Sequence, residues 1–348
     1  MARKLLWGSL VLGPIVIALH YLTDLGDVGE FVLAAIALVP LAWLIGEATE
    51  HAAHHTGPGI GGFLNATFGN APELIIALIA VNEGLTEVVR GSLTGSVVGN
   101  LLLVLGFSLA LGGPGEVDQR SSFTSIALVG LATALLLIPS EIGWATDDPD
   151  THALAVISLP VACVLLAVYL AVTWQSLRRH RLMHVAQDPV EMAGWSLRRS
   201  LAVLGVATAV TALVAEILVS TIDTFAHEAG LSDFFVAAVI VAIVGNAAEH
   251  GGAIVIARRG NIKLAAEIAL VSSAQVAVFL IPAVAILSWA IEPLSLAFRP
   301  VEIGVLASAT ALTAVLLLNG RSSRAKGVAL IAAYVLAAIA FYVAGNRT

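Results

Sequence analysis

The chain carries one five-residue motif twice, as Gly69-Asn70-Ala71-Pro72-Glu73 and as Gly245-Asn246-Ala247-Ala248-Glu249. Each copy places a carboxylate inside an otherwise apolar segment, where an ionisable residue is costly and is by default functional. The two glutamates are 176 positions apart (249 − 73), and Ser96 and Ser272 repeat that interval. Two separated landmarks at one interval indicate an internal repeat. Matching Gly-containing interruptions in two halves are typical of a transporter's binding site.

The composition is that of a membrane protein. Of the 348 residues, 59% are hydrophobic and only 12% are charged, whereas about a quarter of a soluble domain is charged. The single cysteine, Cys163, lies in an apolar run, which excludes a disulfide framework and a cysteine-rich metal site. The net charge of −7 indicates little about function, because the distribution of charge along the chain matters more than its total. We expect no nucleic-acid partner.

Hydropathy predicts an all-α polytopic membrane protein with about eleven transmembrane helices, each near the ~20 residues that cross a bilayer. The predicted spans are 5–22, 31–54, 60–82, 89–111, 122–142, 153–175, 199–222, 233–258, 264–290, 300–319 and 327–345. The first resembles a signal peptide, but it lacks a small-residue cleavage site and is interpreted as a retained helix. Thr56-Gly57-Pro58-Gly59 predicts a turn between the second and third spans.

Lys and Arg predict the orientation. With the N-terminus in the cytoplasm, 14 of these residues fall on the inner side and 3 outside, as the positive-inside rule requires. An odd number of spans then puts the C-terminus outside. The compact termini suit an integral protein of a prokaryotic plasma membrane.

A polar stretch divides the chain into two halves. We expect a leading helix in 1–30, a first five-helix repeat in 31–175, a cytoplasmic linker in 176–198 and a second five-helix repeat in 199–348. Because each half holds an odd number of spans, the halves have opposite orientations in the membrane. This is the inverted-repeat architecture of secondary transporters.

The repeated motifs supply oxygen ligands for a hard cation. Pro72 stops one helix and fits the first turn of the next, which predicts a broken helix. Gly69 and Gly245 allow the backbone to approach an ion closely. Carboxylate, amide, hydroxyl and backbone oxygens are what Ca2+ prefers, and the lack of thiolates or a clear imidazole cage argues against zinc or copper as the main substrate. The predicted cation and proton ligands are Glu73, Glu249, Asn70, Asn246, Ser96, Asn100, Ser272, Ser273 and Gln275.

Two carboxylates also predict how transport is coupled. A dry site favours the neutral form of each Glu, so the pair is neutralised either by one divalent cation or by two protons. Alternation between these states is proton-coupled exchange, with at least two protons per divalent ion. The structural alternative is that both glutamates are hydrogen-bonded pins near the ends of their spans.

The two motif regions resemble a known family. Residues 69–103 read GNAPELIIALIAVNEGLTEVVRGSLTGSVVGNLLL and residues 245–282 read GNAAEHGGAIVIARRGNIKLAAEIALVSSAQVAVFLIP. They are similar to the signature repeats of the calcium/cation–proton exchanger (CAX) family of the cation/calcium antiporter superfamily. The resemblance implies that Glu73 and Glu249 bind the cation and the protons in turn. Val271 departs from the family, which has Gly before Ser272, and the basic Arg178, Arg179 and Arg181 stand where eukaryotic relatives carry an acidic helix.

A second polar cluster lies on the second span. Its members share one helical face and are Glu47, Glu50, His51, His54 and His55. It is interpreted as a wet polar face, as a vestibule or proton relay with Glu50 paralleling Glu216, or as an intramembrane zinc site of a hydrolase using His51 and His55. His250 is a further candidate for proton transfer or for a structural hydrogen bond.

The sequence thus predicts a membrane antiporter, not an enzyme, that exports Ca2+ in exchange for external protons by alternating access. It needs no cofactor, and its partners are the transported Ca2+ and H+ and the lipid bilayer. An antiporter of the same fold for Na+, K+ or Mn2+ is the first alternative and the zinc hydrolase the second. The oligomeric state stays open between a monomer and a homo-oligomer.

Overall fold

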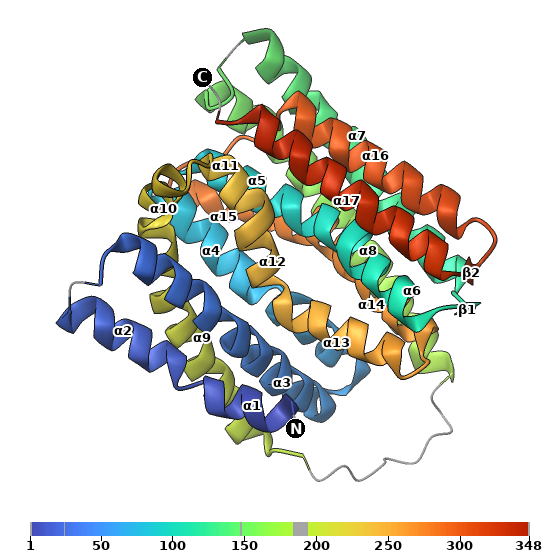
Figure 1. Cartoon of the computed structure of the whole chain (residues 1–348). Helices are drawn as coiled ribbons and strands as arrows, with labels where there is room; N and C mark the ends of the chain where they lie inside the picture. The colour runs from blue at the N-terminus through green and yellow to red at the C-terminus, as the bar shows by residue number, and fades with distance from the viewer. Residues whose placement is uncertain (1, 24, 147, 184–193, 347–348) are drawn as a thin grey trace.

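The computed structural model describes residues 2–346 apart from 24, 147 and 184–193, and it shows a bundle of helices (Figure 1). The helices before the predicted linker are α1 (Ala2–Ser9), α2 (Leu12–Leu22), α3 (Asp27–Phe68), α4 (Ala71–Asn82), α5 (Thr86–Val98), the π-helical η1 (Gly99–Val104), α6 (Leu105–Gly112), α7 (Gln119–Thr146) and α8 (His152–Met183). Most of the predicted linker, 184–193 of 176–198, lies outside the described residues.

The second half begins with α9. Its helices are α9 (Leu197–Ser220), α10 (Ile222–Ala229), α11 (Asp233–Phe235), the π-helical η2 (Val236–Val241), α12 (Ala242–Gly245), α13 (Ala247–Arg258), α14 (Ile262–Gln275), the π-helical η3 (Val276–Leu280), α15 (Ile281–Leu287), the short 3-10 helix η4 (Ser288–Ala290), α16 (Pro300–Leu317) and α17 (Arg324–Ala344). Two-residue strands, β1 (Gly115–Glu116) and β2 (Arg321–Ser322), pair antiparallel and join the end of α6 to the start of α17.

Nine helical segments of the described chain are long and apolar enough to cross a membrane, or ten if the helices on either side of a 108° bend at 230–232 form one span. They match nine of the eleven predicted spans. The two predicted spans without such a match, 60–82 and 233–258, are the two that carry the repeated motif. Each of these two segments is broken at its motif, so neither is one uninterrupted apolar helix, and the predicted all-α membrane architecture with about eleven spans is confirmed.

The turn predicted at Thr56-Gly57-Pro58-Gly59 was wrong. The residues are helical from Asp27 through Phe68, so the second span and the first part of the third belong to one 42-residue helix, α3. Gly and Pro are tolerated inside membrane helices because neighbouring helices satisfy the backbone groups that they free. The chain leaves the helix only at Gly69-Asn70, directly before the first motif glutamate.

The broken helix predicted from the motif is confirmed, and it occurs in both halves. Asn70 separates α3 from α4, and Asn246 separates α12 from α13. The helices that follow, Ala71–Asn82 and Ala247–Arg258, are each 12 residues long and are related by the same 176-residue interval as the glutamates. Each motif glutamate is therefore held in the first turn of a short helix.

The next long helix of each half contains a π-helical segment at the matching place. In the first half η1 follows α5, and in the second half η3 follows α14. A π-helical turn shifts the phase of the side chains that follow it and is frequent at functional sites. Sequence periodicity did not predict these segments, although η1 begins at Gly99 and contains the predicted ligand Asn100.

Helix α5 of the first half crosses η2 of the second half at close range. A Cβ added at Gly95 would overlap the carbonyl oxygen of Ala238 and lie 2.8 Å from the Cβ of Ala242. Gly95 therefore lets α5 bring Ser96 to the second half. The residue that matches Gly95 in the second half is Val271, which is partly exposed. The close crossing at Gly95 therefore has no counterpart at the matching position of the second half. Elsewhere α3 and α9, matching helices of the two halves, lie side by side (Figure 1).

We expect Gly95→Ala to lower the free energy of unfolding by at least about 3 kcal/mol, because the added methyl group displaces backbone and not a flexible side chain. Thermal unfolding in detergent measures the change. Val271→Ala at the matching position is the control and should cost less than about 1 kcal/mol. Equal losses for the two variants would contradict the close crossing at Gly95.

Candidate functional site

Three side chains from three helical segments form a hydrogen-bonded chain that ends on Glu249. The Ser272 hydroxyl donates to Glu249 Oε2 at 2.7 Å. Asn100 Nδ2, from η1 of the first half, donates to the same Ser272 oxygen at 3.2 Å. The predicted ligands Glu249, Ser272 and Asn100 are thus brought together, with oxygen and amide groups from both halves around one carboxylate.

The second motif makes a further contact between the halves through Asn246. Asn246 Nδ2 donates to Ser96 Oγ at 2.9 Å and to the Ala242 carbonyl oxygen at 3.0 Å. A Cβ at Gly245 would lie 3.3 Å from Glu73 Cγ, so the glycine of the second motif lies against the glutamate of the first. Asn246 Oδ1 is buried and has no hydrogen-bond partner among the described residues, which leaves an acceptor for a cation or a proton donor.

Glu73 is buried and differs from Glu249 in its partners. Its Oε2 atom accepts no hydrogen bond from the described residues, whereas Glu249 Oε2 accepts one from Ser272. Within the described chain, neither carboxylate forms an ion pair with Lys, Arg or His. A buried carboxylate without a cationic partner is neutralised by a bound cation or by a proton.

The remaining predicted ligands have different positions. Asn70 is buried directly before α4. Ser273 is bonded to the backbone, donating to Ala269 O at 3.1 Å and to Val97 O at 3.4 Å, and so fixes α14 against α5. Gln275, the last residue of α14, is only partly buried. Gly69 lies in the turn before Asn70. The predicted part of Ser273 in cation binding stays a prediction.

The second polar cluster contacts the chain where it emerges from the predicted linker. The His51 ring stacks on Trp195 at 4.8 Å between centroids, and His55 Nε2 is 2.7 Å from the Trp195 carbonyl oxygen. His51 also lies 3.5 Å from Glu47. Among the described residues, no three His, Cys, Asp or Glu side chains are placed to hold a metal ion. The interpretation as a zinc site is therefore not supported.

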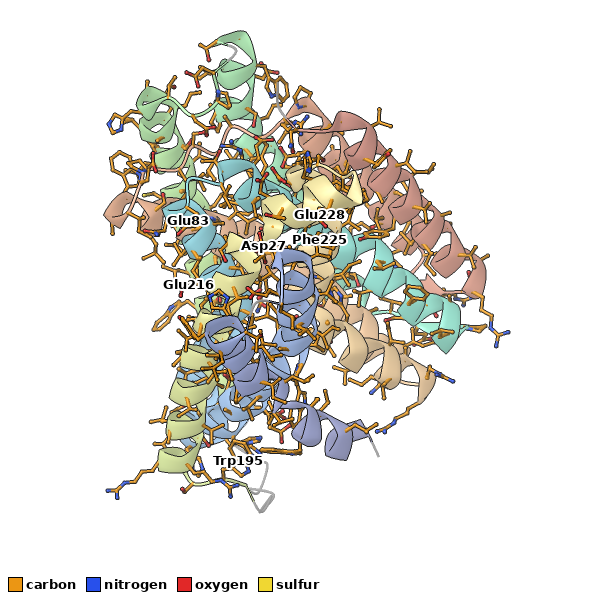
Figure 2. The ribbon with its side chains drawn as sticks, turned by 60° about the vertical axis from the view of Figure 1, so that its left-hand side comes forward. Asp27, Glu83, Trp195, Glu216, Phe225 and Glu228 are labelled. Atoms are coloured by element: carbon orange, nitrogen blue, oxygen red, sulfur yellow. The ribbon has the colours of Figure 1, made fainter. Side chains whose placement is uncertain are left out.

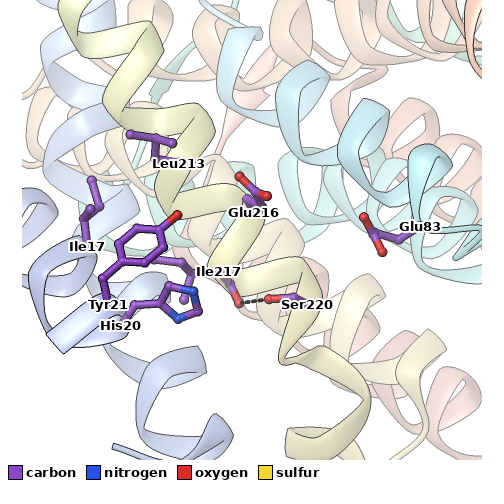
Figure 3. Close-up of a pocket in the computed structure, with 8 residues that line it drawn as sticks. All are labelled: Ile17, His20, Tyr21, Glu83, Leu213, Glu216, Ile217 and Ser220. Carbon is purple, nitrogen blue, oxygen red and sulfur yellow. Dashed lines mark hydrogen bonds between the residues drawn. The ribbon is translucent and has the colours of Figure 1, made fainter. Parts of the chain in front are cut away.

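Glu50 and Glu216 lie at opposite ends of α9. Glu50 is exposed on α3 next to His51, whose ring stacks on Trp195 just before the start of α9. Glu216 lies near the other end of α9, and Figure 2 shows Trp195 and Glu216 at these two places. Glu216 lines a pocket of about 260 Å3 between α2, α4 and α9 (Figure 3). The pocket residues are Ile17, His20, Tyr21, Glu83, Leu213, Glu216, Ile217 and Ser220. The two glutamates do not share one vestibule.

His250 follows Glu249 and is buried. Its Nε2 atom has no hydrogen-bond partner among the described residues. The buried Nε2 atom of His250 therefore keeps one hydrogen-bonding site open. Its predicted part in proton transfer stays a prediction.

A buried charged network lies near the start of α5, and the sequence did not predict it. Arg90 is fully buried and donates to Asp150 at 2.8 Å and to Glu87 at 3.1 Å. Arg299, 3.5 Å from the same Glu87, extends the network to the start of α16. The orientation count treated Arg90 and Arg299 as outer-side exceptions. Arg90 lies inside the predicted span 89–111 and Arg299 lies directly before the predicted span 300–319. Such positions were the sequence feature that indicated buried, paired charges.

Glu302 is a further buried carboxylate that sequence reasoning missed. It is fully buried in the first turn of α16 and accepts from Thr94 Oγ1 at 2.9 Å and from the Arg299 backbone nitrogen at 2.7 Å. Thr94 lies on α5 two residues before Ser96. Glu302 and the Arg90 network therefore fix α5, which carries Ser96, to α16 and to the loop before α8.

Comparisons with known proteins find similar transporters. The family model described as "Sodium/calcium exchanger protein" matches residues 27–178 and 199–343. A Ca(2+)/H(+) antiporter of Synechocystis is 36% identical over 96% of this chain and 95% of its own length. The Ca(2+)/H(+) antiporter ChaA of Bacillus subtilis is also 36% identical, over 90% of this chain and 91% of its own. A crystal structure of the Ca2+/H+ antiporter protein YfkE has a TM-score of 0.82, with 32% identity over 98% of this chain and 99% of that chain.

We expect Arg90→Met to lower the free energy of unfolding by about 3 kcal/mol, because it leaves the carboxylate of Glu87 without its closest cation in a mostly buried network. Thermal unfolding in detergent checks this value. Lys263→Met is the matched control, since it breaks the exposed 3.1 Å pair of Lys263 with Asp118, and exposed pairs contribute little. A loss for Arg90→Met no larger than that for Lys263→Met would contradict a stabilising role.

Proposed function

The chain belongs to the sodium/calcium exchanger protein family, and on this premise we propose that it exchanges cytoplasmic Ca2+ for external protons. Members of the family are transporters, so the chain is an integral membrane transporter and not an enzyme. The choice of Ca2+ and H+ is supported by relatives whose names state that they are Ca(2+)/H(+) antiporters.

One observation carries this proposal. The two motif glutamates come from opposite halves and meet at one junction, where Gly245 lies against Glu73 and Ser272 donates to Glu249. Amide and hydroxyl groups of Asn246, Ser96 and Asn100 surround them. Oxygen-rich donors with two carboxylates are what Ca2+ prefers, with six to eight oxygens at roughly 2.3–2.6 Å.

The chemistry of the site couples the two ions. Two carboxylates that share a junction without a cationic partner need about two positive charges to be neutral. One Ca2+ or two protons supply that charge, so binding of one excludes the other. A carrier that switches between inward-open and outward-open states only when the carboxylate pair is neutral exchanges Ca2+ for protons. It lets neither ion cross the membrane without the other.

Alternating access follows from the two halves. The breaks at Asn70 and Asn246 place the glutamates where α3, α4, α12 and α13 meet, and unwound or broken helices near the midplane are typical of such sites. Movement of the long helices past the short helices that carry the motifs exposes the two glutamates to one side of the membrane at a time. In the proposed orientation, with the N-terminus cytoplasmic, Ca2+ enters from the cytoplasm and leaves outward.

We expect Glu73→Gln and Glu249→Gln each to reduce exchange at least about a hundredfold, because a neutral amide can neither bind Ca2+ as a carboxylate nor carry a proton. The measurement is Ca2+ uptake into reconstituted vesicles with an imposed pH gradient and a Ca2+ dye inside. Protein content and thermal stability of the variants show that the loss is not one of folding.

Glu116→Gln is the control, since Glu116 lies on β1, outside the candidate site. Transport retained in either motif variant would remove the basis of the proposal. Proton movement triggered by Na+, K+ or Mn2+ but not by Ca2+ would keep the exchange mechanism and change the substrate.

A further inference from the structure

A polar pocket lies at the end of the molecule where the strand pair of β1 and β2 joins α6 to α17 (Figure 1). Its volume of about 440 Å3 is within the range of small-molecule sites. The pocket is lined by the two strands and by the starts of α7 and α14, and its polar side chains include Glu116, Asp118, Arg120, Lys263, Asn319 and Arg321. None of these six is a predicted cation ligand, so the pocket is separate from the candidate site. It lies on the cytoplasmic side in the proposed orientation.

Cationic side chains outnumber carboxylates in this pocket. Lys326 Nζ lies at its edge, 2.6 Å from Asn319 Oδ1 and 2.7 Å from the Arg321 carbonyl oxygen. The pocket and its edge therefore hold four cationic side chains against two carboxylates, namely Arg120, Lys263, Arg321 and Lys326 against Glu116 and Asp118. The excess of positive charge favours an anionic ligand.

Two guanidinium groups of the pocket are available to such a ligand. Lys263 is paired with Asp118 at 3.1 Å, which commits one cation and one carboxylate to each other. Arg120 and Arg321 are exposed and form no ion pair within the described chain, although Glu116 stands opposite Arg321 in the strand pair. A guanidinium group is a planar fork of donors that matches the oxygens of a phosphate group.

Exposed apolar side chains adjoin the pocket and favour an amphiphilic ligand. Leu264 follows Lys263 at the start of α14, and Leu318 comes directly after α16; both are exposed. The Gln119 side chain, at the start of α7, donates to the Leu318 carbonyl oxygen at 2.8 Å, so Leu318 lies against the wall of the pocket. Both leucines lie at the ends of segments long and apolar enough to cross a membrane. A free phosphate ion gains nothing from such side chains, whereas the acyl chains of a phospholipid do.

We propose that this pocket binds the phosphate head group of an anionic phospholipid, with Arg120 and Arg321 on the phosphate oxygens and the acyl chains beside Leu264 and Leu318. In the proposed orientation the lipid belongs to the cytoplasmic leaflet, which is rich in anionic lipids, and basic pockets between helices on that side bind such head groups. Because α7 belongs to the first half and β2 to the second, the bound lipid joins the two halves. The inference goes beyond ion exchange and involves neither motif glutamate.

Lipid binding is measured on the purified full chain in neutral detergent, by native mass spectrometry during titration with phosphatidylglycerol or phosphatidylcholine. We expect phosphatidylglycerol to bind at least about tenfold more tightly than the zwitterionic phosphatidylcholine. The double variant Arg120→Gln, Arg321→Gln should bind phosphatidylglycerol at least about tenfold more weakly, because each cation near the head group contributes to its attraction. Arg120→Lys with Arg321→Lys keeps both charges and should stay within about threefold of the original chain.

The matched control is Arg198→Gln with Arg199→Gln. It removes two exposed cations at the start of α9, which lie on the same side of the membrane in the proposed orientation but outside the pocket. The affinity for phosphatidylglycerol should then stay within about twofold of that of the original chain. Both glutamine pairs should keep the lipid-free melting temperature of the original chain, since the replaced side chains are exposed.

Equal weakening by the two glutamine pairs would show a general attraction to positive surface and would overturn the inference. Equal binding of the two lipids would overturn it as well. Displacement of phosphatidylglycerol by an equal concentration of inorganic phosphate would identify a free anion as the ligand and would overturn the assignment to a lipid. Failure of the proposed function is distinguishable, because a chain that transports no Ca2+ but binds phosphatidylglycerol through Arg120 and Arg321 leaves this inference standing.

Discussion

The burial of negative charge at the junction of two halves is the constraint on which the rest of the structure depends. Among the described residues, Glu73 and Glu249 form no ion pair with a cationic side chain, so under the proposed function a bound cation or protons would neutralise them. The structure accommodates them with short helices that begin at the motifs, so that each carboxylate lies in a first turn, where the helix dipole favours negative charge. Hydroxyl and amide groups from the opposite half complete the environment.

A second charged network contrasts with the first. Arg90, Arg299, Glu87 and Asp150 satisfy one another directly, so this network requires no mobile ion and holds helices in place. The protein thus uses buried charge in two ways. The Arg90 network, whose charges are balanced by side chains of the protein, is structural. The pair Glu73 and Glu249, whose charges are not balanced by such side chains, is suited to transport. Glu302, which bonds to Thr94 near Ser96, connects the fixed network to the helix of the site.

Sequence reasoning singled out Glu73 and Glu249 and predicted the helix breaks that the structure shows, because the 176-residue repeat and the Gly-Asn-Ala-x-Glu motif are local patterns. The assignment of cation ligands stays a prediction. It failed where partners are distant in the chain. Asp150 is 60 positions from Arg90, and Glu302 is 208 positions from Thr94, and no local pattern joins such pairs. Hydropathy also treats a broken helix and a continuous one alike, and the π-helical segments that begin at Gly99 and Val276 have no sequence periodicity that marks them.

The unequal pair Gly95 and Val271 has a consequence for the energetics of the cycle. In an exchanger built from two identical inverted halves, the inward-open and outward-open states would be mirror images with equal free energy. Here α5 crosses η2 closely at Gly95, while the matching position of the second half carries a branched side chain. Under the proposed alternating access, the two end states would therefore differ in packing and in free energy. Such a carrier would have a preferred resting side even when the ion concentrations across the membrane are equal.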